Sequence, residues 1–172
     1  TFDKCAWEAT KKANRLFTKA ISDEVRDNDL IWVHYCNLML LPEMLRKELA
    51  RSKQSVKVGF FLHTPFPSRE SYRILPARNG IHLGVSHCGI IGLHTYDYTR
   101  HSLAVVRVCC EWTREGRLSM GLINSGLDRT PNWIEIQGRI FTCNAFPIGI
   151  NPNKFKEILR KENDKKRIAG LE

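Results

Sequence analysis

The sequence predicts an α/β fold, a Rossmann-like parallel sheet with flanking helices, from two observations. Short continuous apolar runs alternate along the chain with longer segments in which apolar residues recur at helical spacing. Runs of this kind, bounded by turn residues, are typical of strands buried on both faces of a parallel sheet, and their alternation with helices is typical of βαβ units. The 172 residues, 42% of them hydrophobic, are enough for one domain with a core.

The first third of the chain predicts a helix, a strand and a second helix. Asp3 is a helix-capping residue, and it precedes apolar residues at helical spacing, namely Ala6, Ala9, Ala13, Leu16, Phe17, Ala20 and Ile21. A turn cluster at 27–29 leads to a buried strand over Leu30–Val33. A helix over Leu38–Arg51 follows, with Pro42 in the first turn, where proline is tolerated.

The alternation continues through the middle of the chain. Val56–Leu62 and Cys88–Leu93 predict two further buried strands. His63–Pro67 is not expected to be helical, because a residue before proline avoids the helical region, and Ser68 then begins a helix. Tyr96–Val108 predicts another amphipathic helix.

The last third departs from the alternation. Glu111–Thr142 contains four glycines and predicts a loop followed by a short hairpin, with 111–132 as an insertion or divergent loop. Ala145–Ile150 predicts a last strand with its turn, and Pro152 opens a closing helix.

Composition and motifs exclude several classes of function. The net charge of +9 comes from 27 basic and 18 acidic residues, but basic and aromatic residues do not interleave in a stripe, so we expect no nucleic-acid partner. No apolar run reaches about 18 residues, so we expect no membrane span. No Gly-x-Gly-x-x-Gly follows the first strand, and no Walker motif exists, so no nucleotide cofactor is predicted.

The six cysteines form no Cys-x-x-Cys pair and fit no zinc spacing, so no metal is predicted. Several lie in apolar runs, where they suit small core residues. The first residues resemble neither a secretory signal nor a transit peptide. Together with reduced thiols, this predicts a cytoplasmic protein.

Polar side chains follow three of the predicted strands. His34, His63 and His94 each follow one, and Asp97 lies close behind the last. Because ligands bind at the carboxyl ends of parallel strands, these side chains predict the rim of a pocket. A single histidine after a strand is more often structural, so the prediction of a pocket depends on the three histidines together. They do not indicate which reaction would take place there.

Four stretches at these loops carry a family resemblance. They are Ile31–His34 with Leu38–Pro42, Gly59–Ser68, Gly92–His101 and Phe146–Ile150. In order and spacing they resemble the trehalose-6-phosphate synthases of glycosyltransferase family 20, as does the weaker pattern Trp7-x-x-Thr10-x-x-x-Asn14.

The resemblance implies a retaining glucosyltransferase that moves glucose from UDP-glucose to glucose 6-phosphate, giving trehalose 6-phosphate, without a required metal or cofactor. It also implies the N-terminal half of a two-domain GT-B fold. Residues 1–150 would then be part of the acceptor-binding Rossmann-like domain, and 151–172 the start of a linking helix toward a C-terminal donor domain. The chain begins without Met, which suggests a fragment.

The resemblance also assigns roles to single residues. His63 resembles the histidine that contacts the transferred glucose, and it is the expected catalytic and substrate-binding residue. Trp7 resembles a tryptophan lining the acceptor pocket. Tyr35 replaces the family aspartate that holds acceptor hydroxyls, Thr10 replaces a tyrosine, and His34 matches a structural position.

Two functions remain open at this point. The chain is either part of a glucosyltransferase, or a non-catalytic or regulatory subunit of a trehalose synthase complex that binds other subunits. Tyr35 favours the second, since a phenol presents a different hydrogen-bonding shape from a carboxylate. Alone, the chain is expected to be inactive, because positioning both substrates requires the donor domain.

Overall fold

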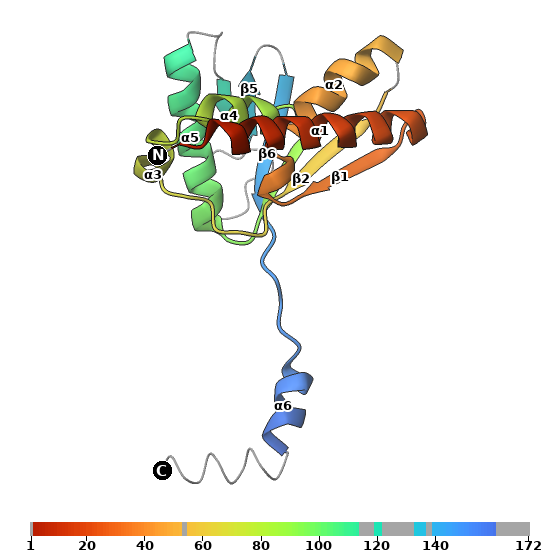
Figure 1. The fold of residues 1–172 in the computed structure, drawn as a ribbon. Helices are drawn as coiled ribbons and strands as arrows, with labels where there is room; N and C mark the ends of the chain where they lie inside the picture. Colours follow the sequence, from red (N-terminus) through yellow and green to blue (C-terminus); the bar gives the residue numbers. More distant parts are fainter. Residues whose placement is uncertain (1, 53–54, 114–118, 122–132, 137–138, 161–172) are drawn as a thin grey trace.

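The computed structural model describes residues 2–52, 55–113, 119–121, 133–136 and 139–160 (Figure 1). The strands are β1 (Leu30–His34), β2 (Lys57–Phe61), β3 (Ile90–Leu93), β4 (Ser119–Gly121), β5 (Trp133–Ile136) and β6 (Arg139–Ala145). The helices are α1 (Lys4–Glu24), the 3-10 turn η1 (Cys36–Leu38), α2 (Leu41–Ser52), α3 (Arg69–Arg73), α4 (Arg78–Val85), α5 (Tyr96–Thr113) and α6 (Pro152–Arg160).

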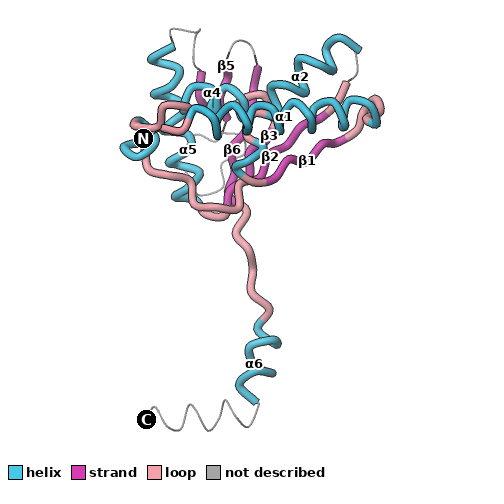
Figure 2. The backbone as a smooth tube through the Cα atoms, in the orientation of Figure 1, coloured by secondary structure: helices cyan, strands magenta, loops and turns pink. Residues whose placement is uncertain are grey.

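All of these strands belong to one sheet of order β1-β2-β3-β6-β5-β4 (Figure 2). β1, β2, β3 and β6 are parallel neighbours, whereas β5 and β4 run antiparallel beside β6. η1 and α2 lie between β1 and β2, α3 and α4 lie between β2 and β3, and α5 follows β3 before the antiparallel strands. The predicted α/β class, with a parallel sheet and flanking helices, is therefore confirmed.

Three helices, α1, α2 and α4, lie side by side in front of the sheet in Figure 1, and α2 contacts both of the others. α2 turns Leu41, Leu45 and Leu49 inward, one turn apart, onto the strands. The buried strand residues that join them in the core include Val33, Val58, Phe60, Ile91, Leu93, Ile134 and Phe141. The helices on this side thus bury one face of the sheet whose carboxyl edge carries the candidate residues.

The first helix begins where the sequence predicts. The Asp3 carboxylate accepts hydrogen bonds from the Cys5 and Ala6 amides, at 2.8 and 3.1 Å. The side that α1 turns inward was not predicted, because its buried residues are Asn14 and Thr18, whereas most of the apolar residues that indicated the helix are exposed.

Two strand predictions need correction. Among the described residues β1 lies at one end of the sheet, and it is not buried on both faces, because Leu30 and Trp32 are 64% and 40% exposed. An apolar run reports β-propensity but not the number of neighbours the strand will have. The strand predicted over Ala145–Ile150 is absent: β6, the second strand of the hairpin, ends at Ala145, and residues 146–150 are not a strand. Its neighbour β3 ends at the paired Leu93, and Pro147 has no amide hydrogen for the ladder.

The helix boundaries also differ from the predictions. η1 precedes α2, so α2 begins at Leu41, although Pro42 lies in its first turn as expected. Ser68 caps α3 through its hydroxyl, which accepts from the Ser71 amide, but the short α3 is followed by a separate α4 that the sequence did not indicate. α5 continues to Thr113, past the predicted end.

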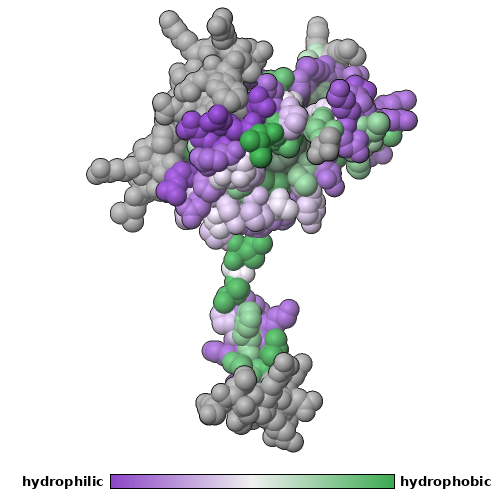
Figure 3. All heavy atoms as spheres, turned by 60° about the vertical axis from the view of Figure 1, so that its left-hand side comes forward, coloured by the Kyte–Doolittle hydropathy of each residue, from purple (hydrophilic) through white to green (hydrophobic). Residues whose placement is uncertain are grey.

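The predicted hairpin is confirmed as β5 and β6. Most of the predicted insertion at 111–132 lies outside the described residues, and the division at residue 150 stays a prediction. Beyond β6 the chain leaves the sheet, and the exposed Phe146, Ile148 and Ile150 give this segment its apolar surface (Figure 3). α6 begins at Pro152, as expected, and stands apart from the sheet (Figure 1).

Candidate functional site

Three histidines meet at the carboxyl edge of the sheet, as the sequence predicts. His34 ends β1, His63 follows β2 and His94 follows β3. His34 Nδ1 and His63 Nε2 share a hydrogen bond of 2.9 Å, with the two rings stacked at 5.1 Å between centroids. The ring of His94 meets His63 edge-on at 5.5 Å. The register of three parallel strands therefore brings together side chains that lie far apart in the chain.

Phe61 forms the floor of this cluster. Its ring centroid lies 4.8 Å from that of His63, 5.1 Å from that of His94 and 6.3 Å from that of Phe146. Gly92 on the neighbouring strand leaves room for the ring, since a Cβ atom there would lie 2.5 Å from a Phe61 ring carbon. The absence of a side chain at Gly92 thus decides where the aromatic floor lies.

Tyr35 covers the cluster from the side of solvent. Its ring lies 4.8 Å from that of His63, tilted by 32°, and the residue is 57% exposed. The backbone at Tyr35 has φ 68° and ψ 155°, a conformation that is populated almost only by glycine. Strain of this kind persists only where surrounding contacts impose it, and it concentrates at functional sites.

The electrostatics of the cluster favour a neutral imidazole. Desolvation lowers the pKa of His63, and the neighbouring His34 and His94 lower it further, because a positive charge beside another is unfavourable. A neutral imidazole has one N–H donor and one acceptor nitrogen. The bond to His34 occupies Nε2, so Nδ1 of His63 is the nitrogen left to meet a ligand hydroxyl.

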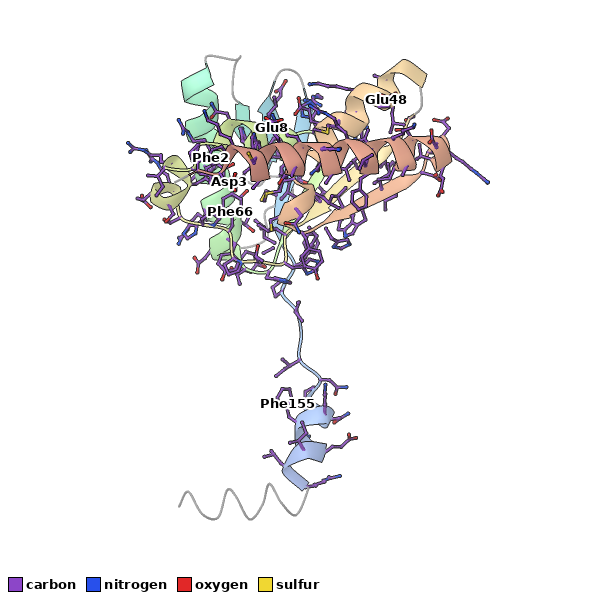
Figure 4. All side chains as sticks on the ribbon, viewed as in Figure 1. Phe2, Asp3, Glu8, Glu48, Phe66 and Phe155 are labelled. Atoms are coloured by element: carbon purple, nitrogen blue, oxygen red, sulfur yellow. The ribbon has the colours of Figure 1, made fainter. Side chains whose placement is uncertain are left out.

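The remaining predicted residues have other surroundings. Trp7 lies in the first turns of α1, where its indole ring faces Phe2 at 6.4 Å and approaches Gly80 of α4; Figure 4 labels Phe2 at this end of the helix. A role for Trp7 in the acceptor pocket stays a prediction. Asp97 is exposed in the first turn of α5 and pairs with Arg100 at 2.9 Å.

The cluster is suited to binding a polyhydroxylated ligand. Imidazole nitrogens offer hydrogen bonds, and the faces of Phe61, Tyr35 and Phe146 offer apolar surface to a sugar ring. His94 Nδ1 is buried and has no hydrogen-bond partner among the described residues. Within the same residues, no group of three or more His, Cys, Asp or Glu side chains is arranged to hold a metal ion.

Sequence reasoning missed Phe61 as part of the site. Phe61 belongs to a buried strand, so its sequence context indicated core.

A parallel α/β sheet with a cluster of polar and aromatic side chains at its carboxyl edge belongs to the class of Rossmann-like folds that bind ligands at that edge. The chain matches the model of glycosyltransferase family 20 over residues 1–172 and belongs to this family. It is 60% identical, over all 172 residues, to alpha,alpha-trehalose-phosphate synthase [UDP-forming] 1 of Aspergillus niger. The alignment covers 100% of this chain but 30% of that relative, so the chain spans about a third of the length of the relatives it matches.

Two solved structures show the same fold. One is the trehalose-phosphate synthase of Burkholderia xenovorans in complex with glucose 6-phosphate, with TM-score 0.72 and 23% identity over 99% of this chain and 35% of that one. The other is the N-terminal domain of the trehalose-6-phosphate phosphatase of Candida albicans, with TM-score 0.68 and 26% identity over 96% of this chain and 32% of that one. The fold therefore occurs both in a synthase and in a phosphatase, and the site has to decide the function.

Proposed function

We propose that this chain forms the acceptor-binding part of a UDP-forming trehalose-phosphate synthase. In this proposal glucose is transferred from UDP-glucose to glucose 6-phosphate, with no metal or other cofactor. The observation that carries it is the His34–His63–His94 cluster at the sheet edge, in a chain 60% identical to a UDP-forming synthase. The cluster lies at the sheet edge where ligands of such folds bind.

The proposed roles follow from the contacts. His63 directs Nδ1 toward a hydroxyl of the transferred glucose, and the stacked His34 fixes the orientation of the ring. Tyr35 and Trp7 border the acceptor. Catalysis would rest on holding the two sugars in place and on stabilising the leaving diphosphate from the remainder of the protein, as positioning and electrostatic effects supply most of such a rate enhancement.

The cell compartment and the assembly also belong to this proposal. Every helix among the described residues is too short or too polar to cross a bilayer. We propose a cytoplasmic protein, which fits the reduced thiols that the sequence indicates. Association with other trehalose synthase subunits is the second candidate function, and the exposed Tyr35 ring in place of a carboxylate is the observation that favours it.

One experiment tests the proposed function. The 172 residues replace the matching segment of the Aspergillus niger synthase, and UDP release from UDP-glucose is measured with and without glucose 6-phosphate. We expect UDP release that depends on the acceptor, and a roughly tenfold loss with His63→Ala, equivalent to about 1.4 kcal/mol of transition-state stabilisation. Thr64→Ala, an exposed change in the next residue, is the control.

The outcomes separate the two candidates. A folded chimera without UDP release that recovers with Tyr35→Asp would mean an enzyme impaired by one side chain. A folded chimera that stays inactive with Tyr35→Asp would contradict the synthase proposal and favour the subunit. Thermal melts with millimolar glucose 6-phosphate report binding independently, because a ligand of the native state alone raises its stability.

A further inference from the structure

The strained backbone of Tyr35 requires something to hold it. At φ 68° and ψ 155° a tyrosine would relax to an extended conformation if its neighbours allowed. On one side, the Tyr35 amide donates to the Phe61 carbonyl at 3.2 Å. On the other, the Tyr35 carbonyl accepts from the Leu38 amide at 3.2 Å, which closes the η1 turn. Neither bond fixes η1 to the helices around it.

Asn14 supplies that attachment from α1. Its side-chain amide donates to the Asn37 carbonyl in η1 at 2.9 Å and to the Thr10 carbonyl within α1 at 2.8 Å. Asn14 is completely buried, so water does not compete for these bonds. The bond to Asn37 joins residues 23 apart in the chain.

The opposite end of the turn is held by close packing. The backbone of Met39 and Leu40 lies directly against Gly84 of α4, where a Cβ atom would come within 2.9 Å of the Leu40 Cα atom. The segment that carries Tyr35 is therefore confined between α1 and α4. With Gly84 fixing the far end, the Asn14 amide is the polar contact that sets the near end.

We propose that Asn14 is a positioning residue: its amide holds η1 so that Tyr35 keeps its strained backbone and its ring stays on His63. The effect on substrate rests on the proposed function, whereas the effect on the Tyr35–His63 contact does not. Asn14 touches neither His63 nor the reacting atoms and acts through the turn alone.

The unpaired side-chain oxygen of Asn14 makes it possible to separate an effect on the position of η1 from an effect on the stability of the fold. Asn14 Oδ1 is buried with no hydrogen-bond partner among the described residues. A buried unsatisfied acceptor is destabilising, so an apolar side chain of similar size removes that penalty, which offsets part of the cost of leaving the Asn37 carbonyl without its donor. Stability can then stay near that of the wild type while η1 is released, and a purely structural role predicts no change at His63.

The test is carried out on the whole chain by proton–carbon NMR of His63. The Cε1–H signal of His63 reports the Tyr35 ring above it, and Tyr35→Leu gives the position of that signal without the ring. We expect Asn14→Leu to move the signal toward the Tyr35→Leu position. Thr18→Val is the matched control, because Thr18 is buried one turn further along α1 and its hydroxyl donates back to the Asn14 carbonyl within the same helix at 2.8 Å.

A second variant covers the case in which Asn14→Leu does not fold. Asn14→Ser keeps a group that can bond the Thr10 carbonyl within the helix but is too short to reach Asn37, so the same signal shift is expected. A folded Asn14 variant with the His63 signal at its wild-type position overturns the proposal.

Glucose 6-phosphate affinity gives the functional readout. We expect a several-fold rise in Kd with either Asn14 variant and none with Thr18→Val. If the wild-type chain binds no glucose 6-phosphate, the proposed function fails, and the His63 signal alone still decides the role of Asn14.

Discussion

Replacing Tyr35 tests the strain in the site directly. Tyr35→Ala and Tyr35→Gly both remove the ring, so the lost contact with His63 is common to the two variants. Only glycine adopts the Tyr35 backbone conformation without steric cost, and relief of such strain is worth about 1–3 kcal/mol. Glycine also loses roughly 0.5–1 kcal/mol to its greater freedom in the unfolded chain. The free energy of unfolding should therefore be higher for Tyr35→Gly than for Tyr35→Ala by about 1 kcal/mol.

The assay is urea unfolding followed by circular dichroism, with equal m-values required for the comparison. The matched control is Lys12, an exposed residue inside α1, where glycine should be less stable than alanine by about 1 kcal/mol. The order of the two variants should thus be opposite at the two positions. If Tyr35→Gly is the less stable variant, as at Lys12, the backbone at Tyr35 is not strained and the reasoning fails.

Three further predictions concern the core. Burial lowers the pKa of His82 to about 4. Between pH 6.5 and 4 the unfolded chain therefore binds a proton at this residue that the folded chain does not bind. The free energy of unfolding should fall by up to about 3 kcal/mol across that range. His82→Leu should flatten this decline in unfolding curves taken across that range; an unchanged decline contradicts it. Gly84→Ala should destabilise by about 1–3 kcal/mol in the same assay, because its Cβ meets the Leu40 backbone, and a neutral effect would mean that α4 shifts freely. Burial raises the pKa of the Cys88 thiol to about 12, so iodoacetamide should modify the exposed Cys36 and spare Cys88 in native protein, as peptide mass mapping would show.

The elements with strong local signals could be predicted from the sequence. Asp3 caps the start of α1, and the apolar run after Asp29 forms β1. Helix capping and β-propensity depend on residues close together in the sequence, so both elements could be predicted from it. The three histidines could be placed at one edge because strands in a parallel sheet end together. The position of β1 at the end of the sheet could not, since it depends on segments that lie far away in the sequence. The division into α3 and α4 had a local signal in Pro76, which lies between the two helices.

The sequence by itself determined the α/β class, the family and the presence of histidines after three strands. The tertiary structure decided the site's geometry: the His34–His63 hydrogen bond, the floor that Phe61 forms beside Gly92, and the ring of Tyr35 above His63. It also decided that α1 turns its polar Asn14 inward while Leu16 stays exposed. The physical reason is that hydrophobic periodicity shows only which face of a helix is apolar. A polar side chain such as Asn14 can be buried where a carbonyl far away in the sequence accepts its hydrogen bond, and only the tertiary structure shows that partner.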